Sequence, residues 1–243
     1  MLHEVAYRVF FYFSLAAPFV ILEARAPARD VPYRKVILRD LAAYVLVVAI
    51  SLAVGFALFK VYLLLPMDSV FRRAPRLRSW QILPICLVGN DLLLYWLHRA
   101  MHTTAGWRAH RWHHSPKQMY WLAGARASAV HQALFMVPAL LPIVLKAPGN
   151  VYLVTGLWAT LTNHWMHTNF VFRARWLEWL VITPRAHHIH HSDDPAHFGK
   201  NLGSFSSIWD RLFGTWLDPD TLEKPVTFGI PDQVHPARVY LGV

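Results

Sequence analysis

Long runs of apolar positions, separated by short basic connections, dominate this chain. Residues 41–65 hold a single charge, Lys60, and a helix needs about 20 apolar residues to cross the hydrocarbon core of a membrane. Residues 5–22 are nearly as apolar. Because the chain begins without the basic region of a signal peptide, we interpret this second run as an uncleaved membrane helix.

Three further apolar runs follow toward the C-terminal half. Residues 82–97 form a shorter run interrupted by Asn90 and Asp91, and residues 127–145 and 151–170 predict a helical hairpin that turns at a Pro-Gly-Asn sequence. The pattern therefore predicts an all-α integral membrane protein with about four to five membrane helices.

We expect one membrane domain over residues 1–243, because no internal repeat, low-complexity tract or long linker divides the chain. Residues 1–90 are expected to form the N-terminal membrane helices, and residues 91–216 the histidine-rich region. Residues 217–243 form a C-terminal tail, whose stretch 219–236 is rich in proline and turn residues. We expect this tail to cover the cytoplasmic face.

Composition agrees with a membrane protein. Of the 243 residues, 55% are hydrophobic and 16% are charged, whereas soluble domains carry about 25% charge. Mean hydropathy is +0.28. The single cysteine, Cys86, excludes an intramolecular disulfide framework and a metal site made of four thiolates.

The formal net charge of +10 is explained by membrane topology rather than by nucleic acid. Loops rich in Lys and Arg stay on the cytoplasmic side of a membrane. Residues 23–40, 98–126 and 171–243 hold five, five and seven of these residues, whereas the alternate connections, 66–81 and 146–150, hold four and one. This asymmetry places the histidine-rich segments on the cytoplasmic side, and we expect no nucleic-acid partner.

Histidine is the chemically informative residue type, because 13 of the 15 histidines lie between His98 and His197. In the string HRAMH, His98 and His102 are four positions apart and Asp91 precedes His98 by seven, so that the three share one helical stripe at about 100° per residue. We favour a hydrogen bond from the His98 ring to the Asp91 carboxylate, with Arg99 as the alternative partner of Asp91.

Two further strings have spacings of three and four, again on one helical face. They contain His110, His113 and His114 in HRWHH, and His187, His190 and His191 in HHIHH. The last string also carries His188 as an additional ring. Between these strings, His164 and His167 close the last apolar helix, and either or both could bind metal. We prefer His167 because it lies nearer to the membrane interface.

A single buried histidine is usually a hydrogen-bonded core residue, but eight rings on one side of a membrane need another explanation. Each unsatisfied polar group near an apolar phase costs about 1–3 kcal/mol. Neutral imidazole binds iron, zinc or copper, and a shared metal centre accepts the lone pairs. Eight rings exceed the coordination of one ion, so we expect two. We expect His131 to bind either backbone or metal, and His197 to contact a ligand ring.

The strings HRAMH, HRWHH and HHIHH, followed by Asn201 and the sequence WDRLFGT at 209–215, resemble the fatty acid hydroxylase/sterol desaturase superfamily. The resemblance covers residues 91–216, and residues 183–203 are similar to the C-terminal signature of that family. It implies an integral membrane enzyme that holds two iron ions. Such an enzyme uses O2 and external electrons to hydroxylate or desaturate a C–H bond of a lipid such as a sterol, a fatty acyl chain or a carotenoid.

The resemblance also implies the residues of the site. The metal ligands that it implies are His98, His102, His110, His113, His114, His187, His190 and His191, with His167 or His164 in addition. We expect Asp91 and Asn201 to take part in catalysis. Zinc could replace iron in purified material.

Electrons for the reaction are expected to come from a separate protein. No GxGxxG nucleotide fingerprint follows a strand in this sequence. We expect a ferredoxin, or a small b-type cytochrome with its reductase, to dock on the basic cytoplasmic face. The C-terminus carries no Lys-rich or KDEL-type retrieval signal, which favours a bacterial inner membrane over the endoplasmic reticulum.

The sequence is also compatible with two other functions. A zinc-dependent membrane lipid hydrolase would use the same histidines, but the chain has no HExxH motif and no carboxylate base beside a histidine pair. A non-catalytic metal-binding or metal-transporting membrane protein would need polar residues along several spans, and Asn90 and Asp91 are nearly alone.

Overall fold

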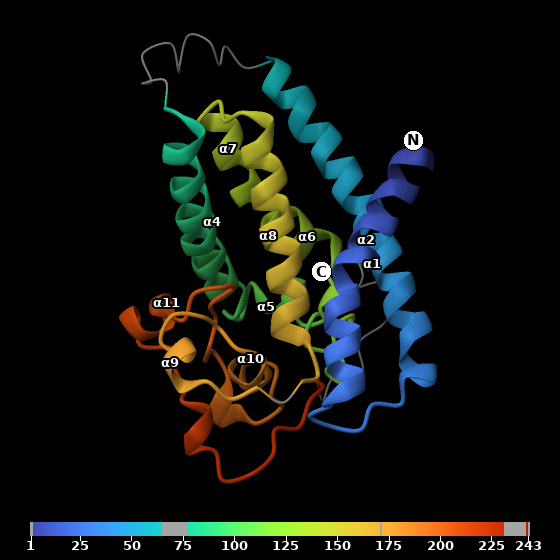
Figure 1. Ribbon diagram of the computed structural model, residues 1–243, viewed down its shortest axis with the longest axis vertical. Coiled ribbons are helices and arrows are strands. Elements are labelled where there is room, and N and C mark those ends of the chain that lie inside the picture. Colours follow the sequence, from blue (N-terminus) through green and yellow to red (C-terminus); the bar gives the residue numbers. More distant parts are fainter. Residues whose placement is uncertain (1, 65–76, 171, 231–241, 243) are drawn as a thin grey trace.

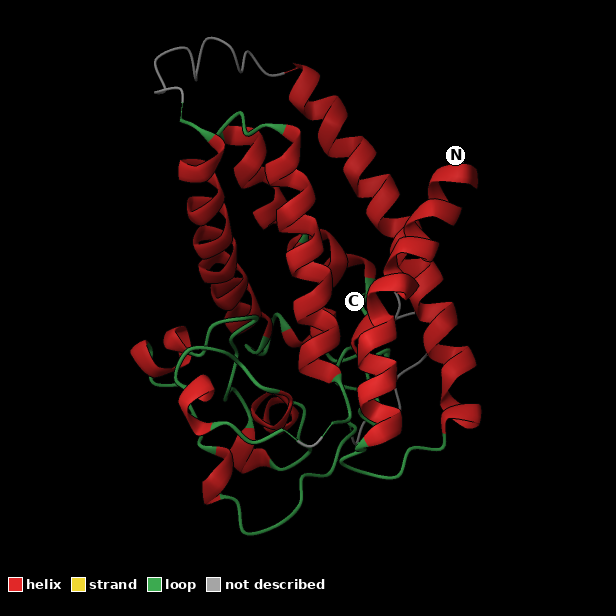
Figure 2. Ribbon diagram, viewed as in Figure 1, coloured by secondary structure: helices red, strands yellow, loops and turns green. Residues whose placement is uncertain are grey.

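The computed structural model describes residues 2–64, 77–170, 172–230 and 242. Within these residues the fold is helical, and extended residues meet only as isolated bridges (Figure 2). The predicted all-α class is therefore confirmed. The long helices are α1 (Leu2–Arg25), α2 (Tyr33–Leu64), α4 (Ser79–Met101) and α8 (Gly149–His167).

The long helices run along the length of the molecule, and most of the short elements gather at one end, whereas α6 (Ala129–Phe135) and α7 (Leu140–Val144) lie alongside the long helices (Figure 1). The short elements at this end are α5 (Trp107–His110), η1 (Ala123–Ala125), α9 (Arg175–Glu178), α10 (Pro184–His190), η3 (Pro195–His197), α11 (Ile208–Leu212) and η4 (Pro219–Thr221). They carry or adjoin the histidine strings, so the strings share one end of the helical bundle.

In the part of the chain that the structure describes, two helices are long and apolar enough to cross a membrane, namely Tyr33–Leu58 within α2 and the whole of α4. Apolar side chains of both helices face outward: Phe56 is 63% exposed and Val88 is 57% exposed. Exposed apolar surface of this kind is typical of a lipid contact. The predicted span 5–22 lies within α1. The total of four to five crossings stays a prediction.

The predicted hairpin differs from the structure in its first arm. This arm consists of α6 (Ala129–Phe135), η2 (Val137–Ala139) and α7 (Leu140–Val144) instead of one helix over 127–145. Pro138 and Pro142 explain the break, because proline lacks the N–H that an α-helix needs and its ring clashes with the preceding turn. The turn also lies earlier than expected: Lys146 has a φ of 50°, and α8 already begins at Gly149.

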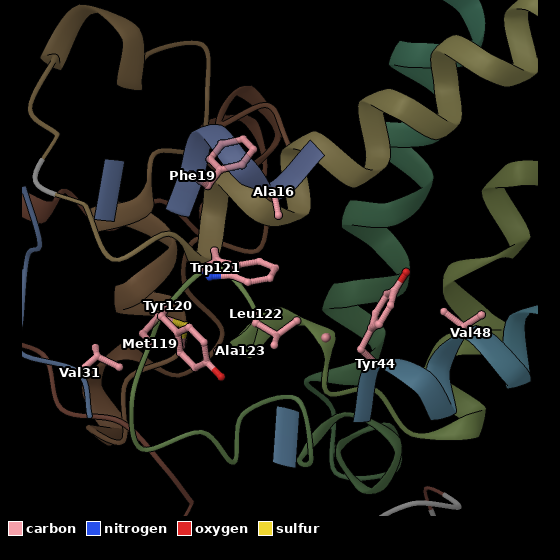
Figure 3. Packing of buried hydrophobic residues seen from close by; sticks show 11 residues of the cluster. Ala16, Phe19, Val31, Tyr44, Val48, Met119, Tyr120, Trp121, Leu122 and Ala123 are labelled. Atoms are coloured by element: carbon pink, nitrogen blue, oxygen red, sulfur yellow. The ribbon is translucent and has the colours of Figure 1, made fainter. Parts of the chain in front are cut away.

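Residues 119–125 are buried between α1 and α2 (Figure 3). The ring of Trp121 lies 5.7 Å from that of Phe13 on α1, and Phe13 lies 5.4 Å from Tyr44 on α2, both in edge-to-face geometry. Such pairs add to the stability gained from burying the rings. This packing fixes the segment that connects the HRWHH string to α6.

Two buried carboxylates fasten the same segment to the long helices. Asp40 of α2 forms an ion pair with Arg126 and accepts a hydrogen bond of 2.7 Å from the Tyr120 hydroxyl. Glu23 of α1 accepts a hydrogen bond of 2.7 Å from the backbone N–H of Trp121. Because an unpaired buried charge is costly, these contacts hold the segment in one position.

The described part of the C-terminal tail contacts α10 and the residues that follow it, and its expected position on the cytoplasmic face stays a prediction. The Arg185 side chain of α10 donates a hydrogen bond of 2.5 Å to Asp220, and Ser192 forms an isolated bridge with Phe228. Most of the remaining tail, residues 231–241, lies outside the described residues.

Candidate metal centre

Helix ends position the histidine rings. His98 lies in the last turn of α4 and His102 is the C-cap residue of that helix, so two rings four positions apart share one face. His110 ends α5. His187 and His190 lie on α10, which begins with a proline at its first position, where the missing N–H costs nothing.

These elements bring nine of the ten predicted ligands into two groups. The first group consists of His98, His102, His110, His114 and His190. The second group consists of His113, His167, His187 and His191. Within each group the ring nitrogens that could bind a metal lie within 4.8 Å of one another. The groups are adjacent, because the stacked rings of His114 and His191 have centroids 4.4 Å apart. The arrangement offers two metal sites.

Ring nitrogens within each group are spaced like ligands of one ion. In the first group the Nε2 of His110 lies 3.0 Å from that of His98 and 3.1 Å from that of His114. In the second group the Nε2 atoms of His187 and His167 are 3.3 Å apart. Two nitrogens bound at about 2.1 Å from one ion, at a right angle, lie about 3.0 Å apart.

Backbone carbonyls orient four of the rings. The Nδ1 atoms of His98, His113, His167 and His190 lie 2.7, 3.0, 2.8 and 2.9 Å from the carbonyl oxygens of Leu202, Arg126, Asn163 and Lys200. Because a carbonyl oxygen only accepts, each Nδ1 carries the proton, and the Nε2 of the neutral ring keeps its lone pair. Hydrogen bonds of this kind typically support metal-binding histidines.

Two rings of the first group have buried nitrogens without a partner in the described part of the chain, and these show whether a metal ion fits the site. Among the described residues, the Nε2 atoms of His102 and His190 are buried and have no hydrogen-bond partner. A buried unsatisfied nitrogen costs about 1–3 kcal/mol. A metal ion would accept both lone pairs and remove this cost, so the donor set fits a bound metal.

Burial keeps the rings in the form that binds metal. It lowers the pKa well below the ordinary value, and neighbouring rings add to the effect, in His110, His113, His114, His187, His190 and His191. A lowered pKa favours the neutral imidazole. Neutral imidazole is the metal-binding form of histidine.

The Asp91 carboxylate does not hold His98, contrary to our expectation. It accepts hydrogen bonds from the backbone N–H groups of residues 205–206 and from the indole of Trp209, at 2.8 to 3.1 Å. A shared helical stripe was insufficient, because seven residues of helix separate two positions by about 10 Å. The Nδ1–H of His98 is taken by Leu202 instead. A catalytic role for Asp91 stays a prediction.

Arg99, the alternative partner considered for Asp91, also bonds elsewhere. Its guanidinium donates to the hydroxyl of Tyr95 at 2.9 Å and to the carbonyl of Phe213 at 3.2 Å. The Tyr95 hydroxyl lies 2.9 Å from that of Thr215. These contacts tie the end of α4 to the segment after α11.

Asn201 and Asp210 hold the backbone around the rings. Asn201 has a positive φ of 52°, and its amide donates to the carbonyls of Ala186 at 2.9 Å and Leu217 at 3.0 Å. Asp210 accepts the backbone N–H of Leu202 at 2.7 Å. The contacts of Asn201 are therefore with backbone, and its expected part in catalysis stays a prediction.

His164 lies outside both groups. Its ring packs against Phe19 and Trp121, with centroids 5.6 and 5.5 Å apart. Of the two histidines that close α8, the structure places His167 alone among the grouped rings. Its position one residue before the C-cap points it toward the second group, whereas His164 turns toward α1.

The other histidines have separate partners. The Nδ1 of His188 lies 3.0 Å from the Arg29 guanidinium, and that of His197 lies 2.9 Å from the Ser192 hydroxyl, so His197 does not contact a ligand ring through this nitrogen. His131 is buried, and its Nδ1 lies 3.2 Å from that of His110. His131 therefore contacts the ring of His110, whereas from the sequence we expected it to bind either backbone or metal.

Two cavities reach the histidine groups from different sides. The first, of about 250 Å³, is bounded by α2, α6 and α8 and touches His98, His113, His131, His167 and His187. The second, of about 540 Å³, touches His102, His114 and His190. The two share no lining residue. The first adjoins the apolar helices, and the second lies among the short elements.

Comparison with known proteins identifies relatives among lipid-modifying enzymes. Alkylglycerol monooxygenase of Xenopus tropicalis is 30% identical over 64% of this chain and 34% of its own length. Ornithine lipid hydroxylase OlsE of Rhizobium tropici is 31% identical over 55% of this chain and 41% of its own length. Methylsterol monooxygenase erg25A of Aspergillus fumigatus is 33% identical over 56% and 46%. This chain therefore aligns with about a third to a half of each relative. No solved structure matches.

The family assignment rests on the part of the chain that builds the histidine groups. The sequence model described as fatty acid hydroxylase matches residues 83–215, which are more than half of the chain. Both groups lie within this match. The chain belongs to the fatty acid hydroxylase family.

Proposed function

We propose that this protein is a membrane-bound non-haem di-iron oxidoreductase that uses O2 and external electrons to hydroxylate, or alternatively desaturate, a C–H bond of a lipid. The observation that supports it most directly is the pair of histidine groups beside a cavity bounded by apolar helices. The named relatives act on alkylglycerols, ornithine lipids and methylsterols, which supports a lipid as the substrate class.

Iron is the metal that we propose. The two groups consist of imidazoles, which suit iron, zinc and copper, and among the described residues neither group includes a carboxylate or a thiolate. Two bound iron ions would supply the reduction of O2 by two electrons and two protons, with one oxygen atom going to the lipid C–H bond and the other to water.

The chain itself supplies the place for the alkyl chain. The cavity of about 250 Å³ is lined by the histidine rings at one end and by Tyr44, Val47, Phe135 and Met166 around it. These walls exclude water from the reacting C–H bond and hold it beside Nε2-bearing rings. The ring orientations are fixed by the carbonyls of Leu202 and Arg126, so the ligands need little rearrangement.

A separate protein is proposed to deliver the electrons. The cavity of about 540 Å³ gives His102, His114 and His190 a second approach on a side that the lipid cavity does not use. A ferredoxin or b-type cytochrome docking there would reduce the metal without displacing the lipid. We place this side in the cytoplasm, and we propose a bacterial inner membrane, on the distribution of Lys and Arg along the sequence.

A hydrolase is less well supported by the geometry. Zinc hydrolases position a carboxylate or similar base beside the metal-bound water. Asp91 is engaged by two backbone N–H groups and an indole, and Asp210 by backbone N–H groups and a hydroxyl. Neither carboxylate is free to act as that base.

The test combines metal content with lipid analysis. Detergent-purified protein should hold about two irons per chain by elemental mass spectrometry. Cells that express the chain should contain a lipid heavier by one oxygen or lighter by two hydrogens. The variants His113→Ala and His190→Ala remove one ring from each group, and each should lose metal and product. His197→Ala is the matched control, because this ring lies outside both groups. Undiminished product in the first two variants would refute the proposal.

A further inference from the structure

A third cavity extends the lipid cavity away from the histidines. It measures about 190 Å³ and lies between α4, the broken segment α6 to α7, and α8. Phe135, Ala159 and Ser204 line both this cavity and the one of about 250 Å³, so the two adjoin. An elongated lipid that reaches the histidine rings can therefore continue along α4.

Asn90 projects a polar group into this otherwise largely apolar cavity. It lies near the middle of α4, eight residues before His98, which corresponds to about 12 Å along the helix. Among the described residues, its side-chain Oδ1 is buried and has no hydrogen-bond partner. A buried acceptor without a donor lowers stability, and few such groups persist in folded proteins without a functional reason.

Three neighbouring polar residues of the cavity already have hydrogen-bond partners. The Asp91 carboxylate accepts three hydrogen bonds. The hydroxyls of Thr155 and Thr162 donate to carbonyls of their own helix, at 2.9 Å to Val151 and 3.1 Å to Ala159. Asn90 differs from these three residues because its acceptor is left for a ligand.

We propose that Asn90, which lies about 12 Å from His98 along α4, binds a hydrogen-bond donor of the lipid substrate, a hydroxyl or an amide N–H. This inference rests on the proposed function and narrows its substrate class. The lipid would be an elongated molecule with a donor group in that position, since a purely hydrocarbon chain would leave Oδ1 unpaired. The carbon that is oxidised would lie at the other end of the joined cavities, beside the histidine rings, and not next to the donor group.

Two probes of equal length test this contact without turnover. Hexadecanol carries a hydroxyl donor, and hexadecyl methyl ether has none. Metal-loaded protein in detergent, without an electron donor, is heated at increasing mole fractions of each probe, and the rise of Tm gives an apparent Kd. The wild-type chain should bind the alcohol roughly three- to tenfold more tightly than the ether.

The variant Asn90→Leu should abolish the preference for the alcohol and should raise the Tm of the ligand-free protein, because it removes an unpaired buried amide. Thr155→Val is the matched control, since it also removes a polar atom from the cavity wall but one that is already bonded within α8. This control should keep the preference.

Equal binding of both probes by the wild-type chain would overturn the inference, as would a preference that persists in Asn90→Leu or a failure of the alcohol to bind. These outcomes leave the proposed function standing, because metal content and oxidised lipid are measured separately. Conversely, a confirmed preference in a protein that forms no oxidised lipid would refute the proposed function and leave Asn90 as a lipid-binding residue.

Discussion

The Nδ1 of His98 donates to the backbone carbonyl of Leu202 across 2.7 Å, and so joins the end of α4 to a loop more than one hundred residues later. The N–H of Leu202 donates to the Asp210 carboxylate at 2.7 Å, and so does the N–H of Gly203, which shares a peptide group with that carbonyl, at 2.8 Å. Asp210 thus holds in place the backbone of Leu202, whose carbonyl orients the ring of His98. The chain of bonds explains why an aspartate distant from the metal groups is fully buried.

Replacing Asp210 should weaken metal binding by the first group. The N–H groups of Leu202 and Gly203 each bond one of the two carboxylate oxygens, and Asp210→Asn turns one of these oxygens into an NH2 group that cannot accept, so that one backbone N–H loses its partner. Loss of a residue that supports a ligand typically costs about 10- to 100-fold in metal affinity. Competitive titration with a metal chelator measures this affinity. Glu223→Gln makes a similar change at an exposed site and should have no effect; equal affinity in both variants would contradict the prediction.

The histidine strings could be assigned from sequence because helical periodicity alone determines which rings share a face. His187, His190 and His191 lie close together at α10 and its C-cap, but His190 belongs to the first group and His187 and His191 to the second, a division that periodicity does not predict. Their carbonyl partners could not be assigned, because contacts such as that of His190 with Lys200 depend on the tertiary path of a loop. The predicted hydrogen bond between Asp91 and His98 was wrong for a related reason. Two positions on one stripe of a helix can still lie too far apart along the helix axis for their side chains to meet.

The first arm of the hairpin is a different case, because the break in its helix could have been predicted from the sequence but not from hydrophobicity. Pro138 and Pro142 stand in an apolar run whose hydropathy suggests one helix, and they break it into three short pieces. His164 and His167 could be told apart only in the structure, since two rings three positions apart lie about 60° apart around the helix and tertiary packing decides which of them reaches the metal groups.

The two histidines at the end of α8 should differ in their effect on metal content. His167→Gln removes a ring of the second group and should lower bound metal from about two ions per chain to about one. His164→Gln should retain both ions, because its ring packs against Phe19 and Trp121. Elemental mass spectrometry of both variants decides the matter. Loss of metal in His164→Gln with retention in His167→Gln would reverse the assignment.

Acid should destabilise the folded protein, both without and with bound metal. Burial lowers the pKa of grouped rings such as His110, His114 and His190 below the value of about 6.5 that histidine has in the unfolded chain. Below that pH the unfolded state binds more protons than the folded state, so stability is lost as the pH falls. Bound metal competes with protons for the same lone pairs.

Thermal unfolding at about pH 7.5 and about pH 5.5, with and without metal, measures the effect. The Tm of both samples should fall over this interval, and the metal-loaded protein should lose at least as much stability, because the metal binds only unprotonated rings. A metal-free Tm that stays constant, or rises, on acidification would show that the rings are not held neutral in the folded state.

The buried ion pair between Asp40 and Arg126 should contribute strongly to stability. Both side chains are almost fully buried, at 0% and 3% exposure, and removing one partner of such a pair costs about 3–5 kcal/mol. Asp40→Asn should lower the Tm accordingly. Because the Arg126 carbonyl receives the Nδ1–H of His113, the same variant should also weaken metal binding by the second group.

Arg39→Gln provides the control for Asp40→Asn. The Arg39 guanidinium lies 4.0 Å from the same carboxylate, but its side chain is 60% exposed, and exposed pairs contribute about 0–1 kcal/mol. Unfolding of both variants in one detergent, followed by circular dichroism, compares the two contacts directly. A loss of Tm in Asp40→Asn no larger than that in Arg39→Gln would mean that neighbouring groups, such as the Tyr120 hydroxyl, hold the segment without the charge on Asp40.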